Sequence, residues 1–189
     1  MVFPERGAAG DDPDMKEANE SAGRVEDLSR LVLAEARVKG LTICCAESCT
    51  GGLLSGALTE NAGSSDVFAG GVVSYSNRSK TRILKVPEEL IQEYGAVSEE
   101  CALAMASGVL DLFESDIACS VTGIAGPGGA APGKPVGLVW FALTSSLGSK
   151  SFVRYFKGDR RSIREMAVAS ALMEVVEVLK RAKGVDHDC

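Results

Sequence analysis

Apolar residues along this chain follow two alternating patterns, one typical of helices and one typical of buried strands. The first helical pattern covers residues 25–39 and stops at Gly40, a residue that favours a helix end. A continuous apolar run over residues 41–46 follows and has the length of a buried strand. Residues 1–22 are rich in Gly, Asp, Glu and Pro without apolar periodicity, so we expect a disordered polar tail there.

The rest of the chain repeats this alternation. Helices are predicted at residues 53–58, 87–94, 98–115 and from Asp159 onward, with a short helix or an ordered loop at 76–84. Strands are predicted at residues 68–75, 117–122, 136–144 and 151–156, the last two joined as a hairpin. This order predicts an α/β fold, a three-layer α/β/α sandwich with a mixed, mostly parallel sheet.

Length and charge narrow the class of protein. A chain of 189 residues suits one domain, which we place at residues 23–183, with a flexible C-terminus at 184–189. The net charge of −6 disfavours a general nucleic-acid surface, and an anionic substrate would need a local cationic site. No apolar stretch is long enough to span a membrane, and the polar N-terminus resembles neither a signal nor a transit peptide. We therefore expect a cytoplasmic protein.

Cysteine usage favours the same compartment. The six cysteines include no C-x-x-C pair, and His187 is the only histidine. Neither a zinc site nor a Cys–His catalytic pair is expected. Because Cys44, Cys45, Cys101 and Cys119 lie in apolar runs, we interpret them as buried free thiols of a reducing cytoplasm.

The stretch Ala-Glu-Ser-Cys-Thr-Gly-Gly at residues 46–52 lies where the first strand gives way to a helix. Unpaired backbone N–H groups at such a point stabilise an alkoxide, an oxyanion or a phosphate, which makes Ser48 a candidate nucleophile. Gly51 and Gly52 would let a ligand approach the backbone. The alternative is that Ser48 only caps the helix and the glycines serve packing.

Three predicted strands are followed by loops rich in polar residues or glycine. If these strands are parallel, the loop that carries Ser48 and the loops after Tyr75 and Thr122 meet at one sheet edge, where ligands bind in open α/β folds. Lys80, in the second of these segments, is then the natural base for Ser48, and Tyr75 could orient the lysine or donate to an oxyanion. The alternative is that Lys80 is an ordinary solvated lysine.

An anion site is also predicted. The glycine- and proline-rich loop after Thr122 lacks the Walker A pattern but could surround a phosphate or ribose with backbone N–H groups. Arg160 lies in the first turn of the last helix, where a cation opposes the helix dipole. A bound anion would resolve that conflict, although a solvated arginine would also fit.

Several motifs taken together resemble the CinA C-terminal domain family, the nicotinamide-nucleotide amidases. They lie at residues 46–52, 71–77, 95–100, 122–129 and 134–137, and the resemblance spans residues 28–181. One departure is the loop segment at residues 130–134, Ala-Ala-Pro-Gly-Lys, where many members have an acidic residue before the lysine. Full CinA proteins have an additional N-terminal domain, which this chain is too short to include.

The resemblance implies hydrolysis of the carboxamide of nicotinamide mononucleotide (NMN) to nicotinic acid mononucleotide and ammonia, without metal or cofactor. It implies that Ser48 is the nucleophile, that Lys80 is the base and that Tyr75 assists. The substrate-binding residues would be Thr50, Gly51, Gly52, Thr122, Gly123, Gly126, Gly128 and Arg160. Arg160 would meet the phosphate, and Thr122 would line the pocket.

Two other functions remain possible from the sequence. The same fold could form a nucleotide-binding or regulatory module that does no chemistry, or a structural oligomerisation domain. For the amidase we expect a small-molecule nucleotide substrate, no nucleic-acid or membrane partner, and a homo-oligomer.

Overall fold

The computed structural model describes residues 13–182, with side chains from Arg24 onward. Five strands form one sheet in the order β2-β1-β3-β4-β5. β1 (Ile43–Glu47) pairs in parallel with β2 (Phe68–Val73) and with β3 (Ile117–Gly123). β4 (Leu138–Ser145) is antiparallel to both β3 and β5 (Gly148–Tyr155). The sheet is therefore mixed, and β4 alone runs against the other strands.

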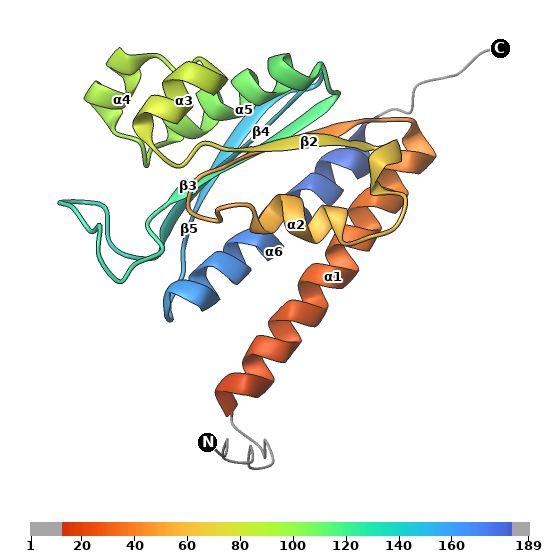
Figure 1. Ribbon diagram of the computed structural model, residues 1–189, viewed down its shortest axis with the longest axis horizontal. Helices are drawn as coiled ribbons and strands as arrows, with labels where there is room; N and C mark the ends of the chain where they lie inside the picture. Colours follow the sequence, from red (N-terminus) through yellow and green to blue (C-terminus); the bar gives the residue numbers. More distant parts are fainter. Residues whose placement is uncertain (1–12, 183–189) are drawn as a thin grey trace, which may run out of the picture.

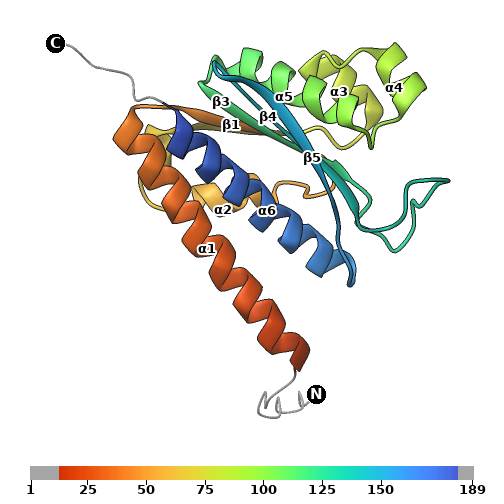
Figure 2. The ribbon, with the colours of Figure 1, turned by 180° about the vertical axis from the view of Figure 1, so that it is seen from behind.

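Helices cover both faces of this sheet, as the sequence predicted (Figures 1 and 2). One face carries α1 (Pro13–Lys39), α2 (Leu53–Thr59) and α6 (Arg160–Arg181). The other carries α3 (Asn77–Leu84), α4 (Glu88–Tyr94) and α5 (Glu99–Phe113). A short 3-10 turn, Ser64–Asp66, precedes β2. All five residues of β1 are buried, because both faces of this central strand are covered. The three-layer α/β/α prediction is confirmed.

The first helix corrects one prediction. It begins at Pro13 rather than at Val25, so residues 13–22 are helical and not a disordered tail. Proline is favoured at the first helical position, and Met15, Lys16 and Glu17 are good helix formers, so the helix extends without an apolar pattern. Residues 1–12 and the predicted flexible end at 184–189 lie outside the described residues.

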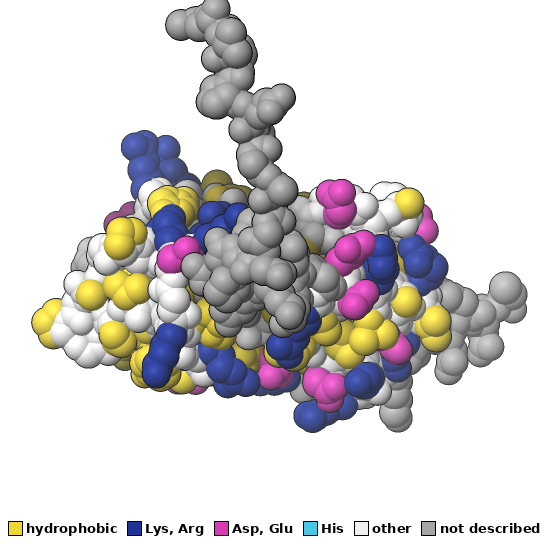
Figure 3. Space-filling view, turned by 90° about the horizontal axis from the view of Figure 1, so that it is seen from below, with side chains coloured by type: hydrophobic (Ala, Val, Ile, Leu, Met, Phe, Trp, Pro, Cys, Tyr) yellow, Lys and Arg dark blue, Asp and Glu magenta, His cyan; other side chains and the backbone are white. Residues whose placement is uncertain are grey.

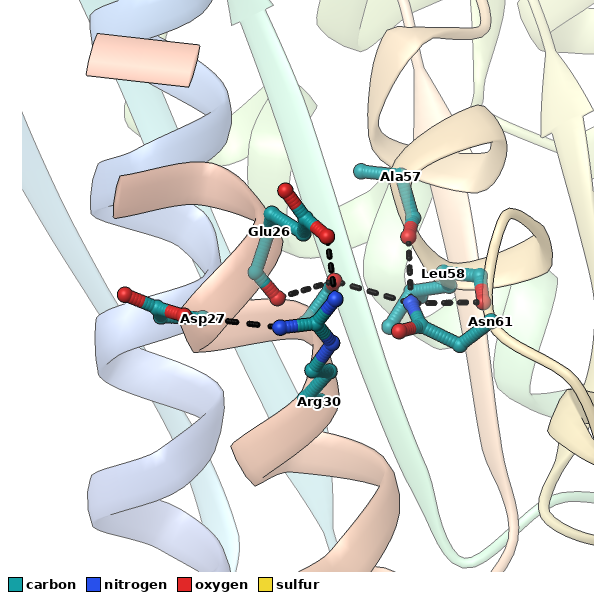
Figure 4. A network of polar contacts seen from close by, with 7 residues as sticks. Glu26, Asp27, Arg30, Ala57, Leu58 and Asn61 are labelled. Carbon is teal, nitrogen blue, oxygen red and sulfur yellow. Dashed lines mark hydrogen bonds and ion pairs between the residues drawn. The ribbon is translucent and has the colours of Figure 1, made fainter. Parts of the chain in front are cut away.

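An asparagine joins α1 to the end of α2. Asn61 Nδ2 donates to Ser29 Oγ at 2.9 Å, and to the carbonyl oxygens of Ala57 at 3.0 Å and Leu58 at 3.4 Å (Figure 4). Arg30, beside Ser29, pairs with two acidic residues of its own helix. These hydrogen bonds close the last turn of α2 and fix its C-terminal end to α1.

The glycines of β2 allow α2 to pack closely on the sheet. The register between β1 and β2 shifts around Ala69, which marks a β-bulge in this glycine-containing strand. A Cβ atom on Gly71 would lie 2.2 Å from Ser55 Oγ, so only glycine leaves room for α2 at this distance. This approach brings the N-terminus of α2 next to the end of β1.

Candidate active site

Three parallel strands end at one edge of the sheet, as expected from the predicted loops. β1 ends at Glu47, β2 at Val73 and β3 at Gly123, and the segments after them carry the candidate residues. Ser48 donates its backbone N–H to the Val121 carbonyl at 2.9 Å, so the serine is held directly against β3. The topology therefore places the predicted loops together.

A serine and a lysine meet at this edge. Lys80 Nζ lies 2.9 Å from Ser48 Oγ and 2.7 Å from the Ser74 carbonyl oxygen. Lys80 is only 1% exposed, so the solvated-lysine alternative is wrong. The N-cap residue of α2 is Gly52 and not Ser48, so the capping alternative for Ser48 is also wrong. The Ser48 hydroxyl thus has a lysine amine as its hydrogen-bond partner, and a second contact, with the Ser74 carbonyl, holds that amine in place.

Local sequence explains how Lys80 is held. Ser76 caps α3 by accepting the Ser79 N–H at 3.1 Å, while Ser79 Oγ accepts the Ser76 N–H at 3.0 Å. This reciprocal box starts the helix just after β2, and the lysine lies one turn further on. The side chain of Lys80 thus points back to the strand end that precedes its own helix.

Burial sets the charge state of Lys80. Desolvation lowers its pKa from the usual 10.5, opposed by the nearby thiols of Cys101 and Cys49. No carboxylate in the described part of the chain forms an ion pair with Lys80. A lysine without a counter-ion in a buried site favours the neutral amine, which can accept a proton.

The neighbouring thiol is not activated. Burial raises the pKa of Cys49 to about 12, with smaller opposing effects from its own N–H, from Lys80 and from the Thr50 N–H. The thiolate is the nucleophilic form of cysteine, and it is scarce at neutral pH when the pKa is so high. Of the two adjacent residues, Ser48 contacts the Lys80 amine, whereas the Cys49 thiol stays protonated.

Glu47 is a buried site residue that the sequence reasoning missed. Its carboxylate accepts the backbone N–H groups of Gly52 at 2.9 Å, Leu54 at 3.1 Å and Ser55 at 2.8 Å. Ser55 Oγ donates to the same carboxylate at 2.6 Å. The helix N-terminus that we expected to be open beside Ser48 is therefore taken by Glu47, and α2 starts only at Leu53. A glutamate closing an apolar strand was the signal for this.

Backbone N–H groups remain available nearer the serine. Those of Cys49, Thr50 and Gly51 have no carbonyl or carboxylate partner among the described residues. The Cys49 N–H is therefore an unpaired donor next to Ser48 in the chain, while the N–H groups of the helix start are bonded to Glu47.

Tyr75 and Arg160 contact each other. Arg160 Nη2 donates to the Tyr75 hydroxyl at 3.1 Å, and its Nη1 donates to the Gly126 carbonyl at 2.7 Å. The tyrosine hydroxyl has no hydrogen bond to Lys80, whose second partner is the Ser74 carbonyl instead. Arg160 thus connects the segment after β2 with the loop after β3.

A cavity of about 250 Å³ opens over the serine and the lysine. Of the predicted site residues it is lined by Ser48, Tyr75, Lys80, Thr122, Gly123, Gly126, Gly128 and Arg160. The Thr122 hydroxyl donates to the Ala96 carbonyl at 2.7 Å. Thr50, Gly51 and Gly52 do not line this cavity, because the chain turns behind Ser48 so that Gly52 can reach Glu47.

Comparison with known proteins identifies the family of this chain. The sequence profile of the CinA C-terminal domain matches residues 25–179. The chain belongs to the CinA C-terminal domain family. A CinA-like protein of Desulfotalea psychrophila is 46% identical over 160 residues, which are 84% of this chain and 38% of that protein. One from Citrifermentans bemidjiense is 49% identical over 154 residues, 81% of this chain and 36% of that protein. The chain thus spans less than two fifths of these relatives.

Solved structures agree with the fold of this CinA domain. The competence damage-inducible protein A (ComA) of Klebsiella pneumoniae is 36% identical with a TM-score of 0.82, over 84% of this chain and 99% of that chain. The competence/damage inducible protein CihA of Agrobacterium tumefaciens is 43% identical with a TM-score of 0.79, over 83% of this chain and 96% of that chain.

Other features of this CinA domain bear on its partners. The described residues contain no group of three or more His, Cys, Asp or Glu side chains that could hold a metal ion. None of the described helices is both long and apolar enough to cross a membrane. Where grey atoms do not cover it, the face in Figure 3 carries Lys and Arg scattered among Asp, Glu and hydrophobic side chains. The expected absence of nucleic-acid partners stays a prediction.

Proposed function

We propose that this CinA domain is a Ser–Lys amidohydrolase that converts NMN to nicotinic acid mononucleotide and ammonia. The observation that carries this proposal is the 2.9 Å contact between Ser48 Oγ and the buried Lys80 Nζ. A serine needs a base to become a nucleophile, and a lysine with a lowered pKa is such a base. The family resemblance supports the choice of substrate.

The residues can be given consistent roles in this reaction. The Ser48 hydroxyl passes its proton to neutral Lys80 as its oxygen bonds to the carboxamide carbon, and the carbonyl oxygen becomes an oxyanion. The Cys49 N–H, which has no backbone partner and belongs to a residue that lines the cavity beside Ser48, is the nearest donor for that charge. The C–N bond then breaks, and the Lys80 ammonium gives its proton to the departing nitrogen, which leaves as ammonia.

Water completes the cycle. It attacks the acyl ester on Ser48 while Lys80 takes one of its protons, and the carbon–oxygen bond to the serine breaks. Lys80 then returns the proton to Ser48, and nicotinic acid mononucleotide leaves. The Ser74 carbonyl keeps Lys80 Nζ in place through both halves, since it contacts the amine independently of Ser48.

Binding of the nucleoside part is assigned to the rest of the cavity, and binding of the phosphate to Arg160 at its border. Arg160 supplies the cation that a protein of net charge −6 needs for a phosphate. Gly123, Gly126 and Gly128 line the same space, and Tyr75 holds Arg160. We further propose that the enzyme works as a homo-oligomer in the cytoplasm, where its buried thiols stay reduced.

The test is ammonia release from NMN by the wild type and by Ser48→Ala. We expect Ser48→Ala to lose nearly all turnover, because removal of a nucleophile costs several orders of magnitude. The variant should remain folded by circular dichroism and should still bind NMN. Ser146→Ala, in the exposed turn between β4 and β5, is the matched control and should behave as wild type.

The outcomes separate the rival functions. Binding of NMN without ammonia release by the wild type would favour a nucleotide-binding module. Failure to bind NMN in a thermal-shift assay would favour a structural domain. Substantial turnover by Ser48→Ala would show that another group is the nucleophile.

A further inference from the structure

A second cavity lies beside the first, at the start of α6. Its volume is about 490 Å³, and its lining includes Val136, Asp159, Arg160, Arg161 and Arg164. Gly126 and Arg160 line both cavities, so the two are continuous neighbours on either side of Arg160. Neither Ser48 nor Lys80 lines this second cavity.

The arginines of this cavity are incompletely neutralised. Arg161 pairs with Glu165 at 2.8 Å, and the Asp159 carboxylate accepts the Ser162 N–H at 2.8 Å as the N-cap of α6. Arg160 and Arg164 form no ion pair with any carboxylate among residues 24–182, and the hydrogen bonds of both are with uncharged oxygens. Two guanidinium groups at one cavity without counter-ions suit an anion.

Arg164 connects this cavity with the nucleophile turn. Its Nη2 donates to the Thr50 carbonyl at 2.6 Å, two residues after Ser48. A Cβ on Gly51 would lie 3.4 Å from the same Nη2, so the guanidinium packs along the turn. The arginine therefore touches the backbone that carries the free N–H groups beside the serine.

Arg164 and Thr50 each have a buried side-chain atom without a hydrogen-bond partner in the described part of the chain. These atoms are Arg164 Nε and Thr50 Oγ1. A buried polar atom without a partner is costly, so such atoms usually have one in the working state. Both belong to the two residues at this junction, and Arg164 also lines the cavity.

We propose that the second cavity binds the phosphate of a phosphate monoester and that Arg164 transmits its occupancy to the Ser48 turn. A phosphate oxygen would accept from Arg164 Nε and from Arg160, while Arg164 Nη2 stays on the Thr50 carbonyl. Arg164 is then a positioning residue. The inference rests on the proposed amidase for its effect on rate, but the phosphate site and the coupling to the turn do not need it.

The consequence is that phosphate contributes to catalysis as well as to affinity. A dianion held by Arg164 restrains the guanidinium, and through the Thr50 carbonyl it restrains the turn that carries Ser48 and the Cys49 N–H. Binding energy from a group remote from the scissile amide then appears in the rate. Such coupling between two sites is typically fivefold or more.

The first experiment splits the substrate into two pieces. Nicotinamide riboside, which lacks the phosphate, is assayed for ammonia release with and without inorganic phosphate. Saturating inorganic phosphate should raise the rate of ammonia release from the riboside by the wild type about fivefold or more. In Arg164→Ala the ratio of rates with and without phosphate should fall to about one. Lys180→Ala, at the other end of α6, is the control and should keep the wild-type ratio.

The variant Arg164→Lys separates the effect of positive charge from the effect of contacting the phosphate and the Thr50 carbonyl at the same time. A lysine keeps the positive charge but has a single ammonium in place of the planar fork. We expect it to retain part of the phosphate binding and to lose the activation. Activation by Arg164→Lys equal to wild type would overturn the relay, since charge alone would then suffice.

The second experiment is independent of turnover. Binding of inorganic phosphate is measured by calorimetry, and amide hydrogen exchange is followed across residues 48–52. We expect phosphate to slow exchange there in wild type and not in Arg164→Ala. Absence of phosphate binding, or binding that leaves exchange unchanged, would overturn the proposal. If wild type hydrolyses neither NMN nor the riboside, the amidase fails while this measurement still decides the site.

Discussion

At the scale of single residues, the decisive feature is a lysine buried without a carboxylate. Lys80 is among the largest fully buried side chains, and its two hydrogen-bond partners are Ser48 and the Ser74 carbonyl. A protonated lysine in such a place is penalised by desolvation, so the amine is neutral over a wider pH range than usual. The same burial that costs stability suits Lys80 to the proposed role of base.

Activity should therefore rise with pH through the lowered pKa of Lys80. Below that pKa the ammonium cannot accept the Ser48 proton, and above it the neutral amine can, so the acidic limb reports this group. Lys80→Arg should be inactive at every pH tested, because guanidinium stays protonated. The measurement is kcat/KM for NMN against pH.

The control for this profile is His187→Ala, since histidine is the side chain that ordinarily titrates near neutrality. Its acidic limb should match that of wild type. Turnover by Lys80→Arg comparable to wild type would exclude the lysine as base.

At the scale of elements, the site depends on how closely α5 approaches the end of α3. A Cβ on Gly108 of α5 would lie 1.9 Å from the carbonyl oxygen of Leu84, the last residue of α3. Lys80 lies one turn before Leu84 on the same short helix. The position of the base is thus set by a glycine in a different helix.

Gly108→Ala should destabilise the domain although alanine is the better helix former. The backbone of α3 would have to move, and overpacking of this kind costs about 1–3 kcal/mol or more. Because α3 carries Lys80, amidase activity should fall too. Gly56→Ala is the matched control: it lies in α2 with nothing within 4 Å of the new Cβ, and should stabilise by about 0.5–1 kcal/mol.

Urea unfolding gives both free energies, and ammonia release gives the activity. Equal stability changes for the two variants would contradict the close approach of α5 to α3.

At the scale of the whole molecule, the site is assembled from segments far apart in the chain. Ser48 follows β1, Tyr75 and Lys80 follow β2, the glycine loop follows β3, and Arg160 starts α6. Arg160 is the residue that touches two of the others, through the Tyr75 hydroxyl and the Gly126 carbonyl. Loss of its side chain should therefore affect recognition without removing the Ser48–Lys80 pair.

Arg160→Ala should lower kcat/KM for NMN by about ten- to hundredfold, since a charge-assisted contact contributes roughly 1.5–3 kcal/mol. Nicotinamide riboside has no phosphate for the arginine to bind, so its hydrolysis should change little. The measurement is ammonia release from both compounds by both proteins. An equal loss for the two would mean that Arg160 acts by holding the loops together.

The order and type of the elements could be predicted because they follow from local pattern. Buried runs such as that before Ser48, and helix starts such as those near Ser98 and Asp159, depend on a few neighbouring residues. In the structure each of these two residues caps its helix. The extension of α1 to Pro13 was missed because helix propensity without apolar periodicity leaves little signal. The meeting of the candidate site residues at one sheet edge could also be predicted, provided that the three strands before them are parallel.

Only the tertiary structure decided which groups meet. The sequence placed Ser48 at a helix start, but the carboxylate of Glu47 takes the helix N–H groups, because packing of Ser55 against Gly71 brings α2 within its reach. The contact of Tyr75 with Arg160 rather than Lys80 likewise depends on where α6 begins in space. Local sequence determines dihedral preference and burial, whereas a hydrogen bond between distant segments depends on the packing of every layer between them.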